Sequence, residues 1–446
     1  MIDSKTWRRA LSIALPLMIA ESINSILWLT DTFFVSRLGD AAIAAVGLGG
    51  YLSWLTFVGG TLFYMGAMVL VSQAYGAGEL GKAERSAGEA LSSNTLLSLP
   101  VAAAMWAASP IILGFLGGPR VGRGIVQLAV DYYRARLIGV PFAYAGLVLG
   151  AVYRAVGRTK PVMVSTTIAA VANALLDPLL IFGLAGFPRL GVAGAGYASA
   201  AAALIDALTL WLLSKKTIGF PVAPKLPSSL ALQAARIGLP AFVERLAFVT
   251  GNMAYIGAVS RCGEKALAAH TIGVRIESLA FLPLFSISEA AAAIAGQETG
   301  ADRIKEAKRT GWQVALLNGA AGIVTMVAIV FLSGLLPRAF TSDPQVIRLA
   351  QLYLIIAALT EPPFGIVLSL GMAIRGAGNT VVPTIINLTG LYLLRVVPAG
   401  ILPRHMPPGL CVLGAWLAMA IDVTGRSIMM IIIYIKYFEK IARKII

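Results

Sequence analysis

Residues 31–45 read DTFFVSRLGDAAIAA, and a close variant of this stretch, YIGAVSRCGEKALAA, occupies residues 255–269. A shift of 224 residues superimposes the two stretches. Further along the chain, a shift of 221 residues superimposes RAVGRT (154–159) on RGAGNT (375–380). Similarity at a fixed period indicates a duplicated unit, so the chain is predicted to be two copies of about 220 residues each.

The composition places both copies in a membrane. Hydrophobic residues make up 58% of the 446 residues and charged residues only 13%, and the mean hydropathy is +0.82. Three runs (41–78, 90–119 and 310–337) contain no Asp, Glu, Lys or Arg. Each run exceeds the roughly 20 residues with which a helix crosses the hydrocarbon core. The fold class is therefore predicted to be an all-α integral membrane protein.

Charge clusters and Gly/Pro breaks divide the chain into twelve expected transmembrane helices, six in each copy. Six spans return each copy to its starting side, so the two lobes are predicted to form a parallel repeat related by a pseudo-twofold axis. The expected domains are an amino-terminal lobe (1–213), a cytoplasmic linker (214–229) and a carboxy-terminal lobe (230–446). The expected spans are 10–36, 47–74, 87–116, 125–153, 161–183, 191–213, 233–260, 266–295, 310–334, 346–373, 380–402 and 409–436.

The net charge of +15 comes mainly from one side of the membrane. With the amino terminus inside, 21 of the 36 Lys and Arg residues fall on the inner side, nine on the outer side and six within spans. This bias predicts a multi-pass protein of the plasma membrane with both termini in the cytoplasm. We expect contact with membrane lipids and none with nucleic acid, and we expect a monomer.

The chain has two cysteines, Cys262 and Cys411. Two residues cannot build a framework of several disulfides or a multi-cysteine metal site. We expect both to be apolar packing residues.

Three polar residues break the symmetry of the repeat. Asp31 corresponds to Tyr255 in the second copy, while Asn173 and Asp177 correspond to Leu394 and Pro398. Residues shared by both copies are expected to serve the architecture, whereas residues present in only one copy are candidates for function. Asn173 and Asp177 are four residues apart, so their side chains share one helix face.

An ionised carboxylate within the bilayer is costly and usually marks an ion or substrate path. Asp31 and Asp177 are both expected in the outer half of the membrane. Two neighbouring carboxylates at low dielectric would keep one proton between them. With the amide oxygen of Asn173 they could instead form an oxygen-only Na⁺ site. The structural alternative is that the two aspartates cap helix ends or meet interfacial water near Pro178.

Four stretches give the whole chain a resemblance to the multidrug and toxic compound extrusion (MATE) family and, within it, to the DinF-like branch. The resemblance implies two six-helix lobes and the export of amphipathic, often cationic compounds in exchange for H⁺ or Na⁺, with no cofactor beyond that cation. The stretches are ALPLMIAESINSILWLTDTFFVSRLGDAAIAAVGL (14–48), NALLDPLLIFG (173–183), GVAGAGYAS (191–199) and ALAAHTIGVRIESLAFLP (266–283).

The same resemblance implies residue roles. Asp31, Asn173 and Asp177 match the ion-coupling cluster of the amino-terminal lobe. Pro16 matches the proline at which the first helix bends, although Pro240 repeats it, as a packing kink required in both lobes would. Supporting roles fall to Ser199 and to Tyr132 or Tyr133. Other members carry coupling carboxylates in the carboxy-terminal lobe, where this chain offers Glu244, Glu277, Glu361 and Asp422 in contexts that do not clearly match.

The 224-residue shift also brings Glu21 onto Arg245, which places opposite charges at one depth on matching helices. One hypothesis pairs them across the cleft as a cytoplasmic latch of the outward-facing state. The alternative, which we favour, is that each residue pairs within its own lobe or extends to the membrane surface.

Two other functions compete with drug antiport. A flippase for lipids or lipid-linked sugars would require a strongly basic cavity for a pyrophosphate. Arginines within or near the spans keep this reading open, namely Arg134, Arg136, Arg275, Arg395 and Arg426. A membrane enzyme is not expected, because His270 and His405 lack metal-ligand spacing and no catalytic motif occurs.

Overall fold

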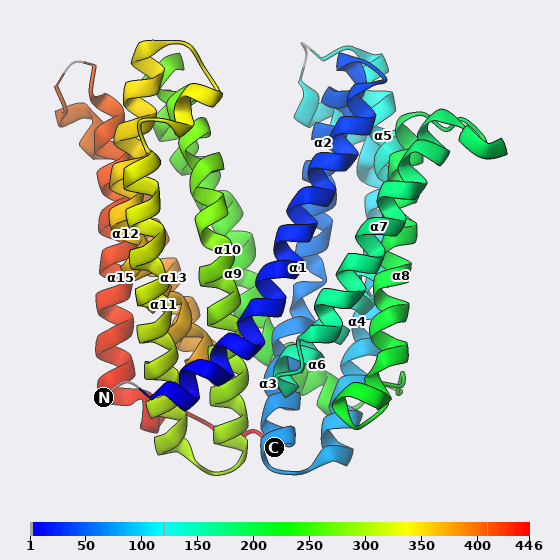
Figure 1. The fold of residues 1–446 in the computed structure, drawn as a ribbon, viewed down its shortest axis with the longest axis vertical. Coiled ribbons are helices and arrows are strands. Elements are labelled where there is room, and N and C mark those ends of the chain that lie inside the picture. The colour runs from blue at the N-terminus through cyan, green and yellow to red at the C-terminus, as the bar shows by residue number, and fades with distance from the viewer. Residues whose placement is uncertain (1–2, 119–120, 408) are drawn as a thin grey trace. The chain divides into compact units, whose positions relative to one another are not determined.

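A computed structural model describes residues 3–118, 121–407 and 409–446 (Figure 1). Within these residues the regular elements are all helices, as predicted, and no strand occurs. The amino-terminal copy contains α1 (Ser4–Ser36), α2 (Asp40–Gly59), α3 (Thr61–Gly76), α4 (Leu80–Gly117), α5 (Arg123–Leu137), α6 (Val140–Val156), α7 (Lys160–Phe182), η1 (Leu184–Gly186) and α8 (Val192–Ile218). The second copy contains α9 (Ser229–Ser260), α10 (Glu264–Gly300), α11 (Ile304–Leu332), η2 (Leu336–Ala339), α12 (Pro344–Gly376), α13 (Val381–Thr389), η3 (Gly390–Val396), α14 (Val397–Ile401), η4 (Leu402–His405) and α15 (Cys411–Ile441).

The helices of the described residues account for the twelve expected spans. Ten helical segments are long and apolar enough to cross a membrane, and α5 with α6, bent by 52°, makes an eleventh. The helix α9 has 32 residues but carries Arg236, Glu244 and Arg245 and is not among these segments. We assign α9 as the twelfth span because it repeats α1 and exceeds the length that a bilayer requires.

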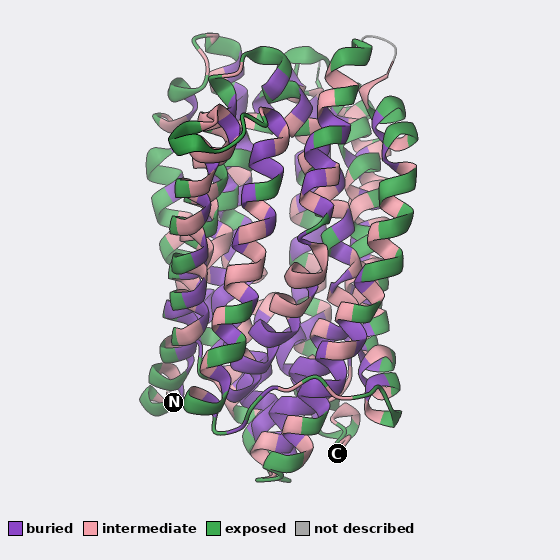
Figure 2. Cartoon of the chain, turned by 90° about the vertical axis from the view of Figure 1, so that its right-hand side faces the viewer, coloured by how far each residue is buried: buried purple, intermediate pink, exposed green. Residues whose placement is uncertain are grey.

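Large apolar side chains are exposed along several of these helices, whose exposed positions are green in Figure 2. Leu175 on α7, Leu212 on α8 and Phe331 on α11 are 63%, 69% and 86% exposed. In a water-soluble protein so much exposed apolar surface would cause association. In this chain it forms the surface that the lipid covers.

The chain folds into two compact units whose bounds differ from the lobes drawn from the sequence. The amino-terminal unit comprises Pro16–Tyr75 and Glu79–Phe242, and the carboxy-terminal unit comprises Met1–Leu15, Gly76–Gly78 and Val243–Ile446. The first halves of α1 and α9 therefore each belong to the unit of the opposite copy. The change of unit in α1 falls at Pro16, which removes a backbone hydrogen bond within the helix.

One buried asparagine in each unit reproduces the repeat at atomic detail. In the amino-terminal unit, the Asn94 amide donates to the carbonyls of Gly60 (3.0 Å) and Tyr144 (2.9 Å). The Asn318 amide donates to the carbonyls of Leu284 (2.9 Å) and Gly365 (3.0 Å), which the shifts of 224 and 221 residues predict. Each asparagine ties its own helix to two neighbouring helices, because a buried carbonyl requires a donor.

Three predicted spans are broken rather than continuous. The span expected at 47–74 divides into α2 and α3 at Gly60, and the span expected at 125–153 bends between α5 and α6. The span expected at 380–402 passes through the π-helical segment η3. A sequence window averages over such breaks, whereas a single glycine or an extra residue per turn is enough to produce them.

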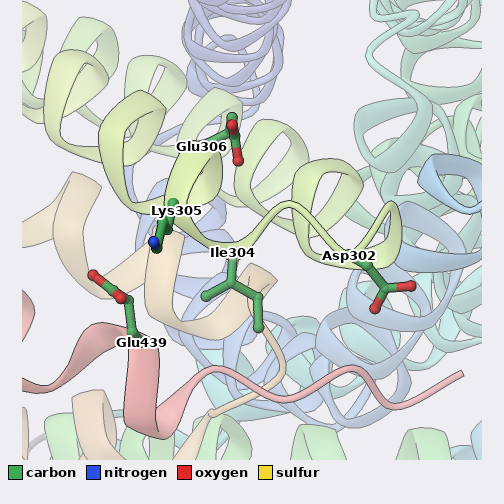
Figure 3. A pocket seen from close by; sticks show the side chains of 5 residues that line it. All are labelled: Asp302, Ile304, Lys305, Glu306 and Glu439. Carbon is green, nitrogen blue, oxygen red and sulfur yellow. The ribbon is translucent and has the colours of Figure 1, made fainter.

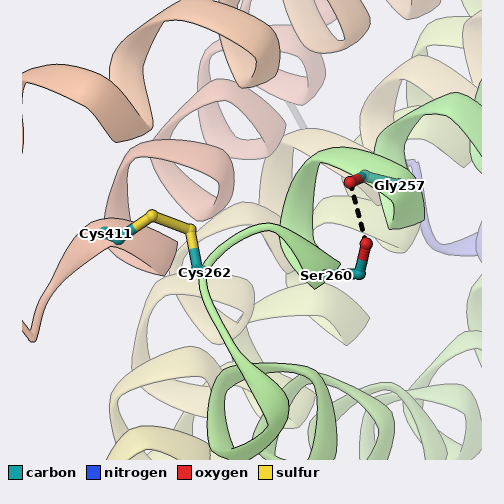
Figure 4. The surroundings of a disulfide bond; sticks show 4 residues. All are labelled: Gly257, Ser260, Cys262 and Cys411. Carbon is teal, nitrogen blue, oxygen red and sulfur yellow. Dashed lines mark hydrogen bonds between the residues drawn. A yellow bond between two sulfur atoms is a disulfide. The ribbon is translucent and has the colours of Figure 1, made fainter.

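The expectation that the two cysteines are separate packing residues is wrong. Cys262, in the turn between α9 and α10, forms a disulfide with Cys411 at the start of α15, and their Cα atoms lie 5.5 Å apart (Figure 4). The bridge spans 149 residues of sequence within the carboxy-terminal unit. Beside it, the Ser260 hydroxyl donates to the Gly257 carbonyl at 2.9 Å and so helps to close the end of α9.

The expected linker is shorter than predicted and is attached to α4. The helix α8 continues to Ile218, and the chain that follows packs on α4 through Lys225, whose ammonium group lies 2.7 Å from Glu84. Ser228 donates from both its backbone N–H (3.0 Å) and its hydroxyl to the buried carboxylate of Glu89. The carboxylate of Glu89 thus supplies the acceptor that the first N–H groups of α9 need.

Candidate functional site

A pair of carboxyl groups lies between two helices of the amino-terminal unit. Asp31 is on the second half of α1, and Asp177 is on α7 and fully buried. The two side chains share a hydrogen bond. Among the described residues, no N–H or hydroxyl group donates to either oxygen of Asp177. Because two carboxylates offer only acceptors, this hydrogen bond requires one of the two to carry a proton.

Asn173 holds the pair from one side. It is fully buried one turn before Asp177, on the same face of α7. In the amide orientation that satisfies both ends, its NH₂ group donates to Asp31 Oδ1 at 2.6 Å and its oxygen accepts from the Ser199 backbone N–H at 3.2 Å. The amide therefore fixes Asp31 relative to α7 and α8.

Arg136 supplies a positive charge that the sequence reasoning did not assign to this site. Its Nη1 atom donates to the Tyr132 hydroxyl (2.8 Å) and lies 3.4 Å from the Ser199 hydroxyl. The guanidinium group also interacts electrostatically with both Asp31 and Asp177. Tyr132 and Arg136 are four residues apart on α5, so a helix face shared with the suspected tyrosine was the signal available in the sequence.

Glycines of the GVAGAGYAS stretch allow α8 to approach its neighbours. A Cβ on Gly194 would lie 2.6 Å from the Leu180 carbonyl of α7, and one on Gly196 would lie 2.5 Å from the Tyr132 carbonyl of α5. These close approaches bring Ser199, one turn later on α8, to Asn173 and Arg136. The packing of α8 against α7 and α5 therefore assembles the site.

The other residues singled out from the sequence lie outside this cluster. Tyr133 is buried, but its hydroxyl is hydrogen-bonded to Thr56 at 2.6 Å, in the packing between α5 and α2. Pro16 is in the interior of α1, fifteen residues before Asp31. Glu21 lies 3.9 Å from Arg154 of the same unit, as the alternative of pairing within the lobe expects. A pairing of Glu21 with Arg245 stays a prediction.

The carboxylates of the carboxy-terminal unit have different surroundings from those of the pair. Asp422 is fully buried and accepts from Arg395 Nε (2.8 Å), Arg426 Nε (2.6 Å) and Arg426 Nη2 (2.8 Å). Glu244 accepts from Arg375 at 2.6 Å, so it too is neutralised by an arginine. These two acids hold helices together.

The other two carboxy-terminal acids have no arginine bonded to them. Glu277 accepts from the Tyr353 hydroxyl rather than from Arg275. Glu361 is 1% exposed, and no group of the described residues donates to either of its oxygens. His270 packs edge-on against Tyr255 and Tyr353, as expected of a buried helix residue.

A cavity of about 370 Å³ lies elsewhere, where α11 begins and α15 ends (Figure 3). Its lining is mostly charged: Asp302, Ile304, Lys305, Glu306 and Glu439. Glu439 is paired with Lys308 at 2.8 Å. Such a lining is typical of a solvated turn and contains none of the intramembrane carboxylates.

The donor set of the amino-terminal cluster suits a proton better than a metal ion. No group of three or more His, Cys, Asp or Glu side chains that could hold a metal occurs in the part of the chain that the structure describes. The amide oxygen that a Na⁺ site would use faces the Ser199 N–H, and the guanidinium of Arg136 is close by. Hard cations require several free oxygen ligands, which this arrangement does not supply.

Comparison with known proteins agrees with this architecture. The MatE family model matches residues 16–179 and again residues 240–401, once in each copy. The chain is 30% identical to the probable multidrug resistance protein NorM of Thermotoga maritima over 437 residues, 96% of this chain and 92% of the relative. It is 26% identical to an FAD transporter of Shewanella oneidensis, covering 88% of this chain and 87% of that one.

The fold is that of the Vibrio cholerae MATE transporter VcmN in its bent form, with a TM-score of 0.89, 19% identity and 98% of each chain covered. The repeat, the helical spans and the matches to both copies agree. The chain therefore belongs to the MatE family, the multidrug and toxic compound extrusion (MATE) transporters.

Proposed function

We propose that the chain is a secondary antiporter of the DinF-like branch that exports amphipathic, often cationic compounds in exchange for protons. The observation that carries the proton coupling is the hydrogen bond between Asp31 and Asp177, which exists only if one of the two is protonated. The multidrug resistance of the named relatives and the four sequence stretches quoted above support the substrate class and the branch.

In this proposal each residue of the cluster has one task. A proton from outside binds between Asp31 and Asp177, and its departure leaves two carboxylates whose mutual repulsion amounts to about 4 kcal/mol at a separation of 4 Å and an effective dielectric constant of 20. Asn173 orients Asp31, and Arg136 stabilises the ionised form of the pair. A cationic substrate relieves the same repulsion, so proton and substrate compete for the pair and exchange in opposite directions.

The proposed location is the plasma membrane with both termini in the cytoplasm. The excess of Lys and Arg on the inner side supports it. The Cys262–Cys411 disulfide gives independent support, because both cysteines fall on the side predicted to be outside and disulfides persist in oxidising compartments.

A lipid-linked substrate has less support. The basic cavity that a pyrophosphate requires would draw on arginines that are engaged elsewhere. Arg395 and Arg426 bind Asp422, Arg136 binds Tyr132, and Arg134 lies 5.1 Å from the ring centre of Trp106. Their charges hold protein groups in place.

The test is ethidium transport into or out of proteoliposomes that contain the purified protein, under either a pH gradient or a Na⁺ gradient alone. The proposal expects transport against the ethidium gradient when only the pH gradient is imposed. Transport driven by Na⁺ alone would contradict proton coupling. No ethidium transport with rapid scrambling of a fluorescent lipid would favour the flippase.

A further inference from the structure

The amino-terminal unit contains a third carboxylate that neither the repeat nor the coupling cluster requires. Asp206 lies on α8, and the corresponding residue of the second copy, 221 positions later, is Ser427. Ser427 donates to the Pro363 carbonyl at 2.6 Å, an ordinary packing contact. Asp206 thus shares with Asp31 and Asp177 the property of being acidic in one copy only.

The surroundings of Asp206 leave part of its carboxylate without a donor. Its Oδ1 atom is buried, and no described group donates to it. The Ser165 hydroxyl of α7 is its hydrogen-bond partner, and Arg154 of α6 acts on it electrostatically without an ion pair within 4 Å among the contacts described. On α6, Gly146 leaves room for the side chain, because a Cβ there would lie 3.3 Å from Oδ2.

Arg154 connects Asp206 to a second acid. Its guanidinium lies 3.9 Å from Glu21 of α1 and 5.9 Å from the ring centre of Tyr64 of α3. The repeat places Arg375 at the same position of the second copy, where it binds Glu244. The pairing of this arginine with a glutamate is therefore shared architecture, and Asp206 is the addition specific to the amino-terminal unit.

The position of Asp206 along the helices lies on the cytoplasmic side of the coupling pair. It comes seven residues after Ser199, which contacts Asn173, and nine residues before Lys215 near the inner end of α8. At 1.5 Å per residue, Asp206 is about 10 Å inward from the coupling cluster and about 13 Å from the end of the helix. A proton that enters from outside through Asp31 and Asp177 must cross this depth to reach the cytoplasm.

We propose that Asp206 is a second proton-binding site, through which the coupling proton leaves for the cytoplasm. This inference rests on the proposed proton antiport. The proton leaves the carboxyl pair for water, one O–H bond forms at Asp206 Oδ1 and neutralises the carboxylate, and the proton then passes to cytoplasmic water. Arg154 favours the return of Asp206 to the ionised form, and Ser165 fixes its orientation.

The experiment compares Asp206→Asn with Asp206→Glu and with the matched control Ser165→Ala in proteoliposomes driven by a pH gradient. We expect Asp206→Asn to bind ethidium within twofold of the wild type but to transport it roughly tenfold more slowly, since a proton-transfer group is lost. Its transport rate should also lose the dependence on cytoplasmic-side pH that the wild type shows. Asp206→Glu should restore both, and Ser165→Ala should keep the pH dependence.

Wild-type speed and pH dependence in Asp206→Asn would overturn the proposal. So would weakened ethidium binding in Asp206→Asn without rescue by Asp206→Glu, because that pattern indicates a packing role. If Asp206→Asn does not fold, Asp206→Glu against Ser165→Ala still decides, since a relay keeps its pH dependence in both. Wild-type transport that a pH gradient does not drive would contradict the proposed function itself, whatever Asp206 does.

Discussion

The same substitution at two fully buried aspartates should have opposite consequences. Asp177 and Asp422 are both 0% exposed, but Asp422 accepts three hydrogen bonds from Arg395 and Arg426, whereas no described group donates to Asp177. Asp422→Asn leaves two guanidinium groups facing a neutral amide, and removing one partner of a buried ion pair costs about 3–5 kcal/mol.

Asp177→Asn removes no donated hydrogen bond, and the new amide can donate to Asp31 in place of the shared proton. We expect its free energy of unfolding to stay within about 1 kcal/mol of the wild type or to rise. Thermal and denaturant unfolding of both variants in one detergent measures the difference. A loss of stability in Asp177→Asn as large as that in Asp422→Asn would refute this reasoning and would support the structural alternative, in which Asp177 caps or anchors its helix.

Three further predictions concern the frame around the site. Asn94→Leu and Asn318→Leu should each cost about 1–3 kcal/mol, because each leaves two buried carbonyls without a donor; chemical unfolding measures it, and a large effect at only one site would contradict their equivalence. Cys262→Ala should lower the melting temperature as much as removal of both cysteines, typically by about 2–4 kcal/mol in stability, and wild-type protein should react with a thiol reagent only after reduction. Hydrogen bonding to Lys265 and to the first turn of α12 lowers the pKa of Asp343 below its usual value of 3.8, so Asp343→Ala should reduce the melting temperature at pH 7. That difference should vanish as the pH falls through the lowered pKa; a constant difference would exclude the ionised cap.

The broad fold and the main cluster could be predicted from the sequence because their signals are local. Charge-free runs predict helical spans, and comparing the two copies isolates Asp31, Asn173 and Asp177 without a structure. The three residues come together because α1 and α7 pack in the same unit. Sequence comparison could also have found Asp206, which is the lone acid of α8 and is matched by a serine, but attention went to residues near the quoted repeat.

Other features depend on contacts that no single stretch encodes. The disulfide joins residues 149 positions apart, and only the predicted sidedness of both cysteines hinted at it. The exchange of the first halves of α1 and α9 between the units follows from packing on both sides of Pro16 and near Pro240. Arg136 was missed because an arginine in an apolar span has many potential partners, and the choice of Tyr132 and Ser199 depends on how closely Gly196 lets α8 approach α5.

The most direct test of the central claim is to count the protons that detergent-solubilised protein releases when ethidium is added, with a pH-sensitive dye in weak buffer. If the Asp31–Asp177 pair holds the coupling proton, wild type should release about one proton per molecule near neutral pH. Asp31→Asn and Asp177→Asn should release none, and Glu21→Gln should behave as the wild type. Undiminished release by both aspartate variants would contradict the account and would place the coupling proton elsewhere in the chain.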